Sequence, residues 1–259
     1  QVSKEGVIID TFFFYYIFSG MNINIKNNTI YPELLDWVKN DKHFSFARYN
    51  DGEWGIILER EPHYSTIKRR WGIPLNELTY KLKSIVEKPL EYFVGIPPKL
   101  VMAWFEDIES VINPNIKPIN SEIIHSRPFK EFKDFLELLK TKNTLLVGPE
   151  YLNSLNFFSD HTVIPEKFVW DHTENIMVKI RQFISNNDNP IIVYSASIAT
   201  NIIIDELYGE YKNSITQIDL GSTLDPHAGV ISRSGHRNYM GENGLEVKRV
   251  FKTNERFNN

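Results

Sequence analysis

The sequence of 259 residues contains no cysteine. This absence excludes disulfide bonds, zinc–thiolate centres and cysteine nucleophiles, and it is compatible with a reducing compartment. Neither sign of charge is in large excess, because 29 Lys and Arg oppose 33 Asp and Glu for a net charge of −4. Such a balance gives no broad basic footprint for nucleic acid, so we expect no nucleic-acid partner.

Several common active-site motifs are also missing from the chain. Without GxGxxG, GxxxxGK[ST], GxSxG or HExxH, the classical dinucleotide-binding, P-loop, hydrolase-elbow and zinc-protease interpretations have no support. No repeat, low-complexity segment or Gly/Ser linker divides the chain, so we interpret residues 21–259 as a single domain. Hydrophobic residues make up 42% and charged residues 24%, which is the composition of a globular protein with a sizeable core.

Residues 1–20 form an apolar N-terminal extension, which we interpret apart from the domain at 21–259. Its segment 11–20, TFFFYYIFSG, is about half as long as a bilayer-spanning helix, so we expect no transmembrane span. The basic start and small-residue cleavage site of a signal peptide are not evident, and we expect a cytoplasmic protein. Three interpretations stay open for the extension: a strand or docking segment, a remnant that is not native to the protein, or a peripheral membrane contact.

Short apolar runs alternate with amphipathic segments along the chain. This order predicts an α/β fold, Rossmann-like, with a mostly parallel sheet and helices on both faces. In such sheets ligands bind at the carboxyl ends of strands, which directs attention to residues 49–54, 95–98, 195–197 and 221–227. The expected helices are 31–40, 76–88, 129–140, 173–184 and 198–209, and the expected strands are 43–49, 91–98, 143–148, 189–197 and 214–221.

An acidic pair, Asp51 and Glu53, brackets Gly52 directly after the first expected strand. In an extended chain these two side chains share a face, and Gly52 permits a sharp turn that aims both carboxylates at one point. Two hard oxygen ligands suit Mg²⁺ or Mn²⁺, which in turn would neutralise a diphosphate leaving group. Asn-Asp-Gly is equally an ordinary turn sequence, so both interpretations stand.

Small hydroxyl residues follow another expected strand, where Ser195 and Ser197 open a helix. Exposed backbone N–H groups and the helix dipole attract phosphate at such a position, and the hydroxyl groups add donors. Capping of the helix by Ser197 is the alternative.

The loop after the last expected strand carries Asp219, Asp225 and His227. A carboxylate and an imidazole in one loop suit general acid–base catalysis, ribose binding or metal binding. An Asp-Pro turn with an exposed histidine is the competing interpretation. Arg127 and the run at residues 68–70 could hold a diphosphate, although most basic runs are solvated surface.

Six motifs together resemble one known family, the GT-D type of glycosyltransferase, once catalogued as a domain of unknown function in bacterial glycosylation clusters. The resemblance spans residues 45–225, and the order and spacing of the motifs carry it. Asn50 replaces a usual glycine, the serine loop replaces Gly-Pro-Thr, and a histidine of the last motif is missing. The motifs are ARYNDGEW at 47–54, VGIPP at 94–98, SRP at 126–128, VGPE at 147–150, SASIATNIIIDEL at 195–207 and DLGSTLD at 219–225.

This resemblance implies a metal-dependent glycosyltransferase that moves a sugar from a nucleotide diphosphate donor to a hydroxyl of a glycan or glycoconjugate acceptor. Asp51 and Glu53 would bind the Mn²⁺ or Mg²⁺ cofactor, and Asp225 would close the last motif. We assign the catalytic base to Asp225 or His227. The expected donor-binding residues are Arg48, Asp51, Glu53, Trp54, Arg127, Ser195, Ser197 and Asp219.

Two other functions are compatible with the same sequence features. One is a non-catalytic module that binds nucleotide or sugar, and the other is a phosphoesterase that uses the same carboxylates.

Overall fold

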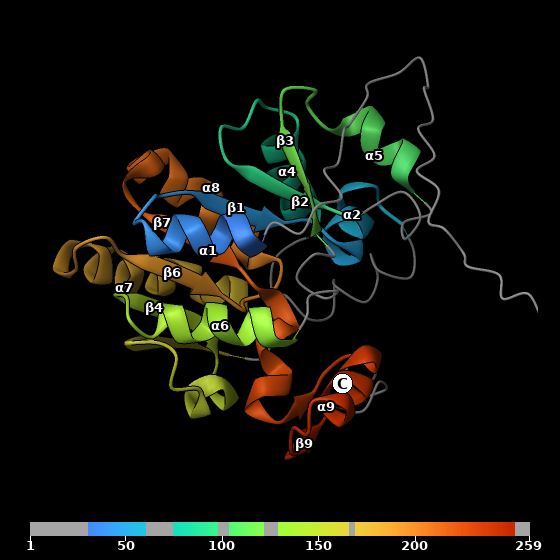
Figure 1. Cartoon of the computed structure of the whole chain (residues 1–259). Coiled ribbons are helices and arrows are strands. Elements are labelled where there is room, and N and C mark those ends of the chain that lie inside the picture. Colours follow the sequence, from blue (N-terminus) through green and yellow to red (C-terminus); the bar gives the residue numbers. More distant parts are fainter. Residues whose placement is uncertain (1–30, 61–74, 98–103, 122–128, 166–168, 252–259) are drawn as a thin grey trace, which may run out of the picture.

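The computed structural model describes residues 31–60, 75–97, 104–121, 129–165 and 169–251 (Figure 1). The apolar extension 1–20, Arg127 and the basic run at 68–70 lie outside these described residues. Within the described part, no helix is long and apolar enough to cross a membrane.

A seven-stranded sheet in the order β3-β2-β1-β7-β6-β4-β5 forms the centre of the molecule. Every neighbouring pair in it is parallel. This topology confirms the predicted Rossmann-like α/β fold. The strands are β1 (Ser45–Arg48), β2 (Phe93–Ile96), β3 (Lys117–Asn120), β4 (Thr144–Pro149), β5 (Asp160–Ile164), β6 (Ile191–Tyr194) and β7 (Thr216–Asp219).

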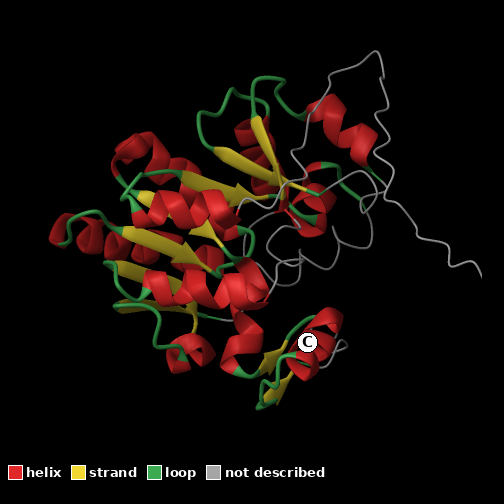
Figure 2. Ribbon diagram, viewed as in Figure 1, coloured by secondary structure: helices red, strands yellow, loops and turns green. Residues whose placement is uncertain are grey.

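Helices connect the strands, and Figure 2 shows them packed on both sides of the sheet. The α-helices are α1 (Tyr31–Lys39), α2 (Asp51–Ile57), α4 (Leu75–Val86), α5 (Phe105–Val111), α6 (Phe129–Leu139), α7 (Thr173–Asn186), α8 (Ala199–Tyr211) and α9 (Ser234–Glu242). The 3₁₀ segments are η2 (Glu150–Ser154), η3 (Val169–His172), η4 (Lys212–Ser214) and η5 (Gly221–Ala228).

Most of the expected strands are too long by several residues, and two further expectations about the ends of elements are wrong. Helix α8 does not end at Gly209 but continues to Tyr211, because an isolated glycine lowers the stability of a helix without ending it. Strand β7 is not the last strand, since β8 (Val230–Ile231) and β9 (Arg249–Val250) pair in a separate small sheet beside α9.

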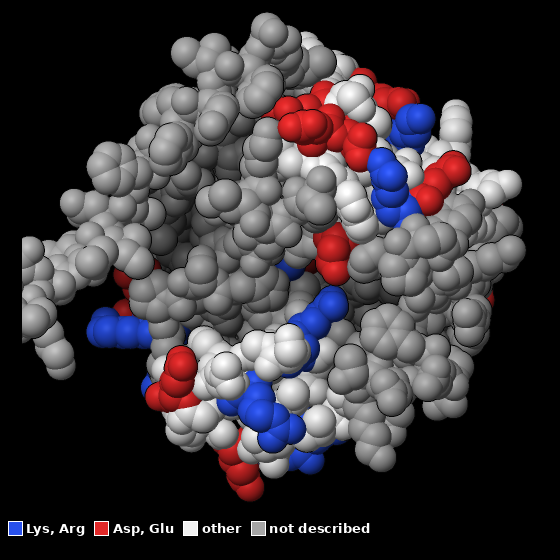
Figure 3. All heavy atoms as spheres, turned by 90° about the vertical axis from the view of Figure 1, so that its right-hand side faces the viewer, with Lys and Arg blue, Asp and Glu red and all other residues white. Residues whose placement is uncertain are grey.

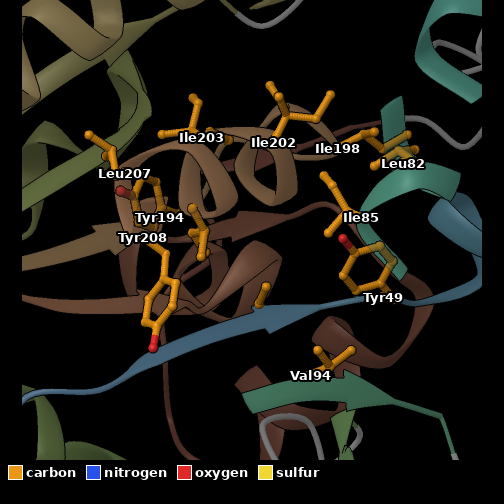
Figure 4. Close-up of a cluster of buried hydrophobic side chains, with 14 of the residues drawn as sticks. Tyr49, Leu82, Ile85, Val94, Tyr194, Ile198, Ile202, Ile203, Leu207 and Tyr208 are labelled. Atoms are coloured by element: carbon orange, nitrogen blue, oxygen red, sulfur yellow. The ribbon is translucent and has the colours of Figure 1, made fainter. Parts of the chain in front are cut away.

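Alternating side chains of the strands supply two hydrophobic layers, one on each face of the sheet. Phe46 of β1 faces the layer that includes side chains of α1 and α6, whereas Ala47 faces the layer of α4, α7 and α8. In Figure 4 the second layer brings Tyr49, Val94 and Tyr194 from the sheet against Ile202 and Leu207 of α8 and neighbouring side chains. The sheet is therefore covered on both faces, which explains why its strands are short apolar runs.

One polar side chain, Gln217, is fully buried among these layers in β7. Its amide oxygen accepts the hydroxyl of Tyr194 in β6 at 2.9 Å, and its amide nitrogen donates to the hydroxyl of Ser45 in β1 at 3.1 Å. The same nitrogen lies 3.3 Å from the carbonyl oxygen of Ile204 in α8. Gln217 thus ties together the three strands whose carboxyl ends meet at the candidate site.

We predict that Gln217→Leu lowers the free energy of unfolding by about 2–3 kcal/mol, because it leaves buried hydroxyl groups without partners. Tyr194→Phe should cost less, about 1 kcal/mol, since it removes one hydroxyl only. Urea unfolding of the two single variants and the double variant measures both effects. A double variant whose loss equals the sum of the single losses would contradict a shared network.

Candidate functional site

The candidate site lies where β1, β7 and β6 end beside one another. In Figure 1 the strand arrows point towards the right-hand side of the molecule, and Figure 3 views that side directly. This face is hollowed near its centre, with an acidic side chain at the hollow and a group of basic side chains below it. This is the edge of the sheet at which the sequence predicted ligand binding, and it holds a cluster of hydrogen-bonded polar groups.

Asp219, the last residue of β7, is buried between two loops. One carboxylate oxygen accepts the backbone N–H of Arg48 at 3.2 Å, and the other accepts the backbone N–H of Gly221 at 2.9 Å. Burial raises the pKa of Asp219 to about 6, although the Arg48 guanidinium and both N–H groups act in the opposite direction. The carboxylate therefore joins the carboxyl ends of β1 and β7. Its burial disfavours the charged form, because water does not solvate it there.

Gly221 and Arg48 form the next contact of this cluster. The Arg48 guanidinium donates through Nη1 to the carbonyl oxygen of Leu220 at 2.9 Å. Gly221 has a left-handed φ of 52°, and a Cβ at this position would lie 2.9 Å from Nη1 of Arg48. The hydroxyl of Ser195 donates to the carbonyl oxygen of Gly221 at 2.7 Å. The backbone angle and the closeness of the arginine both favour glycine here.

Asp51 and Glu53 lie in the first turn of α2, not in an extended segment. Glu53 turns back on its own helix and accepts the backbone N–H of Asn50 at 2.9 Å, as the N3 residue of a capping box does. Side chains two positions apart on a helix point about 200° apart, so the expectation that both share one face is wrong. Acidic residues favour this conformation because they stabilise the positive end of the helix dipole.

Glu53 is half-buried, whereas Asp51 is exposed. Burial raises the pKa of Glu53 to about 7, against the effect of nearby backbone N–H groups, and the charges of Asp219 and Asp51 raise it further. Three carboxylates at the ends of β1 and β7 thus interact electrostatically, and the Arg48 guanidinium offsets part of their charge.

The fit of these carboxylates to a divalent metal depends on how many of them can face one ion. Among the described residues no group of three or more His, Asp and Glu side chains could hold a metal ion by itself. Mg²⁺ and Mn²⁺ commonly use one or two carboxylates and complete their coordination with water and substrate phosphate. A single carboxylate, Asp51 or Glu53, with substrate phosphate fits that second type of site, whereas the two together do not face one ion because they leave α2 in different directions.

The loop after β6 carries Ser195 and Ser197. Ser197 is exposed and has a φ of 56°, an uncommon conformation for a residue with a side chain. The N-cap of α8 is Ile198, without a side-chain cap bond, so capping by Ser197 is not the explanation of this serine. Such strained positions cluster at functional sites, and the phosphate contact of the serines stays a prediction.

Asp225 and His227 have different surroundings although both lie in η5. Asp225 is buried and accepts the hydroxyls of Tyr151, at 3.0 Å, and Ser232. His227 is half-buried, lies 5.2 Å from the Phe132 ring between ring centroids, and has Nε2 3.3 Å from the hydroxyl of Tyr239. Burial argues against Asp225 as a base for an acceptor, and His227 is not the exposed turn residue of the alternative interpretation.

Trp54 is fully buried and packs against the ring of Tyr49, with centroids 5.7 Å apart. This position argues against the predicted donor contact of Trp54, because the ring offers no face to a ligand. The reason is local: the first turn of α2 directs the residue after Glu53 into the core.

Sequence reasoning missed Asn201, a fully buried residue of α8. Its side-chain amide donates to the carbonyl oxygen of Arg48 at 2.7 Å and fixes the end of β1. A lone amide inside the apolar run IATNIIIDEL was the available signal. Tyr151 and Ser232, the partners of Asp225, gave no comparable signal because they belong to short elements without clear periodicity.

Comparisons with known proteins agree with this architecture. No protein-family model and no curated protein sequence matches the chain. A solved structure described as domain of unknown function 1792, in selenomethionine-substituted form, is similar with a TM-score of 0.57 and 16% identity over 84% of this chain and 82% of that chain. A second structure, described as showing that this domain has a distinct glycosyltransferase fold, has a TM-score of 0.56 with the same identity and coverage. The chain therefore has the fold that its resemblance to the GT-D type predicted.

We predict that Gly221→Ala lowers the free energy of unfolding by about 2 kcal/mol, because its Cβ meets the Arg48 guanidinium and its φ is unfavourable. Gly209→Ala is the matched control, since nothing lies within 4 Å of its added Cβ. Alanine should stabilise that helical position by about 0.5–1 kcal/mol. Chemical denaturation measures both variants, and equal effects at the two glycines would contradict the tight contact.

We also predict that the carboxylate of Glu53 makes the metal-free protein less stable as pH rises. The unfolded chain releases this proton near pH 4.5 and the folded chain near pH 7. The folded state binds more protons between these values, so the free energy of unfolding falls through this window.

Glu53→Gln keeps the helix cap and should remove on the order of 2 kcal/mol of this fall between pH 5 and pH 8. Urea unfolding at both pH values, with a chelator present, gives the measurement. Glu206→Gln, at an exposed position of α8, is the control for loss of a carboxylate. Parallel pH profiles for wild type and Glu53→Gln would disprove the buried-charge explanation.

Proposed function

We propose that this protein is a metal-dependent glycosyltransferase that moves a sugar from a nucleotide diphosphate donor to a hydroxyl of a glycan or glycoconjugate. The likeness to a fold described as a glycosyltransferase fold supports the general class. The observation that carries the proposal is the carboxylate cluster of Asp51, Glu53 and Asp219 at the carboxyl ends of β1 and β7. This is the place where open parallel sheets bind their ligands.

Asp51 or Glu53 would hold Mg²⁺ or Mn²⁺, and donor phosphate would supply further ligands. When bound, the cation supplies charge that stabilises the departing nucleotide diphosphate. Arg48 has a bracing role in this proposal: its contact with Leu220 keeps the exit of β7 in place behind the carboxylates. The exposed hydroxyl of Ser197 is a donor for phosphate or sugar oxygens. Sugar transfer of this kind depends mainly on positioning and charge stabilisation, which a rigid cluster provides.

The acceptor hydroxyl needs a base if the transfer inverts the configuration. Of the two expected candidates, His227 is the more accessible, and we propose it in preference to the buried Asp225. An imidazole can accept a proton near neutral pH. Its contact with the Tyr239 hydroxyl would orient the ring.

We predict that the purified chain releases nucleotide diphosphate from a nucleotide sugar only when Mn²⁺ or Mg²⁺ and a glycan acceptor are both present. Panels of nucleotide sugars and acceptors, followed by assay of the released nucleotide, provide the test. Asp51→Asn and Glu53→Gln should lower kcat on the order of 100-fold by removing a charge next to the leaving group. Asp188→Asn, exposed at the amino end of β6, should leave the rate unchanged.

Two results would reject the transferase. Release of sugar and phosphate without an acceptor would indicate a phosphoesterase. A thermal shift with nucleotide diphosphates that persists in excess chelator and in Asp51→Asn, without turnover, would indicate a binding module. For comparison, a ligand at 100 times its Kd stabilises a protein by about 2.7 kcal/mol, which a thermal-shift assay detects.

A further inference from the structure

A buried amide, Asn201, interrupts the apolar run IATNIIIDEL of α8. Its side chain is fully buried, and its Oδ1 has no hydrogen-bond partner among the described groups. Burying an amide in this way costs free energy that an apolar side chain at the same position would not cost. Its Nδ2 donates to the carbonyl oxygen of Arg48 at 2.7 Å. This contact with the end of β1 therefore has to explain why an amide stands in the run.

The hydrogen-bond ladder between β1 and β7 stops before the two strands end. The N–H of Gln217 donates to the carbonyl oxygen of Phe44 at 2.9 Å, which sets the register of this parallel pair. Continued in steps of two residues, the ladder would pair the Arg48 N–H with the Asp219 carbonyl oxygen and the Gly221 N–H with the Arg48 carbonyl oxygen. Instead, both N–H groups donate to the Asp219 carboxylate, at 3.2 and 2.9 Å. The strands diverge here, and the Arg48 carbonyl oxygen needs another donor.

Asn201 supplies that donor, and the peptide group at the end of β1 is then held from both sides. The peptide that links Arg48 to Tyr49 has its carbonyl oxygen on Nδ2 of Asn201. Its N–H donates to the carbonyl oxygen of Gly95 in β2 at 2.8 Å. A planar peptide group that is bonded at both ends has a fixed position and tilt. The amide of Asn201 thus replaces the bond that β7 would have made.

The acidic turn of α2, which we define as residues 51–53, begins directly after this peptide group. Tyr49 and Asn50 alone separate the peptide from Asp51, the first residue of α2. The ring of Tyr49 is fully buried against Trp54, and Figure 4 shows it below the start of α8. With the peptide held and the next side chain fixed in the core, the direction in which the acidic turn leaves β1 is set.

A second contact relates the acidic turn to the same part of α8. A Cβ added to Gly52 would lie 4.0 Å from Cδ1 of Ile198, so the acidic turn lies beside the start of α8. Asn201 follows Ile198 by three positions, which is close to one helical turn. One short stretch of α8 therefore lies beside the acidic turn and also holds the peptide that precedes it.

We propose that Asn201 is a positioning residue for the acidic turn, which it holds in place through the carbonyl oxygen of Arg48. It touches neither the donor nor a metal in this role. The consequence for catalysis rests on the proposed function, because Asp51 and Glu53 are the carboxylates that would serve the metal and the leaving group. The ordering of the turn does not depend on that function, so the two can fail independently.

Hydrogen exchange of the full chain tests the ordering of the acidic turn. The variant Asn201→Leu has an apolar side chain of similar size that cannot donate to Arg48. The N–H groups of Asn50 and Trp54, which are bonded within the cap of α2, should exchange on the order of 10-fold faster than in wild type. Exchange in α6, which packs on the opposite face of the sheet, is the reference for a general loss of stability and should change less.

Thr200→Val is the matched control for this experiment. Thr200 is the neighbouring, equally buried residue of α8, and its hydroxyl has no partner among the described groups. Its replacement should leave exchange in the acidic turn as in wild type. Asn201→Ala, which adds no bulk beside β1, provides the same comparison if Asn201→Leu does not fold. The proposal is overturned if exchange in the acidic turn, relative to α6, is unchanged without the amide or rises equally in Thr200→Val.

The kinetics of sugar transfer provide a second readout. Asn201→Leu should lower kcat on the order of 10-fold to 100-fold with the KM values of donor and acceptor nearly unchanged, since a misplaced carboxylate acts mainly in the transition state. Thr200→Val should keep the wild-type kcat. A folded Asn201→Leu protein that has lost stability but keeps the wild-type kcat would show a structural role alone and overturn the proposal. Wild type without transfer activity would reject the proposed function, and exchange would then decide the role of Asn201.

Discussion

The buried carboxylate of Asp219 is the interaction on which the candidate site depends. It accepts N–H groups from Arg48, at the end of β1, and from Gly221, after β7. Two strands that are distant in sequence are thereby joined at the point where their chains leave the sheet. An uncharged residue could not accept both bonds with two equivalent oxygens, so the charge is retained despite a raised pKa.

The same bonds make the surrounding loops one unit. Asn201 donates to Arg48 from α8, and Ser195 donates to Gly221 from the end of β6. Gln217 repeats the arrangement one layer deeper, between β1, β6 and β7. A polar network of this kind is stable only when nearly every member has a partner, which makes each of these side chains sensitive to substitution. The rigidity that results is what the positioning of a donor molecule requires.

The fold could be predicted from the sequence because its main signals are periodic. Apolar runs such as IIVY at β6 and amphipathic segments such as α6 alternate strongly enough to define a parallel sheet. For the site, the sequence predicted which strand ends form it, but not how the side chains there are arranged. Asp-Gly-Glu suits a turn as well as a first helical turn, and the signal that decides between them, Asn50 followed three residues later by Glu53 before an apolar run, is a capping-box pattern that was not recognised. Burial of Trp54 follows from that same choice, and so it was missed as well.

Asp225 shows why a motif can be located correctly and its chemistry still be misread. Its acidic side chain was expected to act on an acceptor, but it instead accepts hydroxyls from Tyr151 in η2 and Ser232 after β8. These bonds tie η5 to the small β8–β9 sheet and to α9, which packs beside it. The segment that begins with Gly221 at the candidate site is therefore packed against β8 and α9. Because a buried carboxylate with two hydroxyl donors resists movement, the position of α9 relative to η5 is set by the fold rather than by a flexible linker.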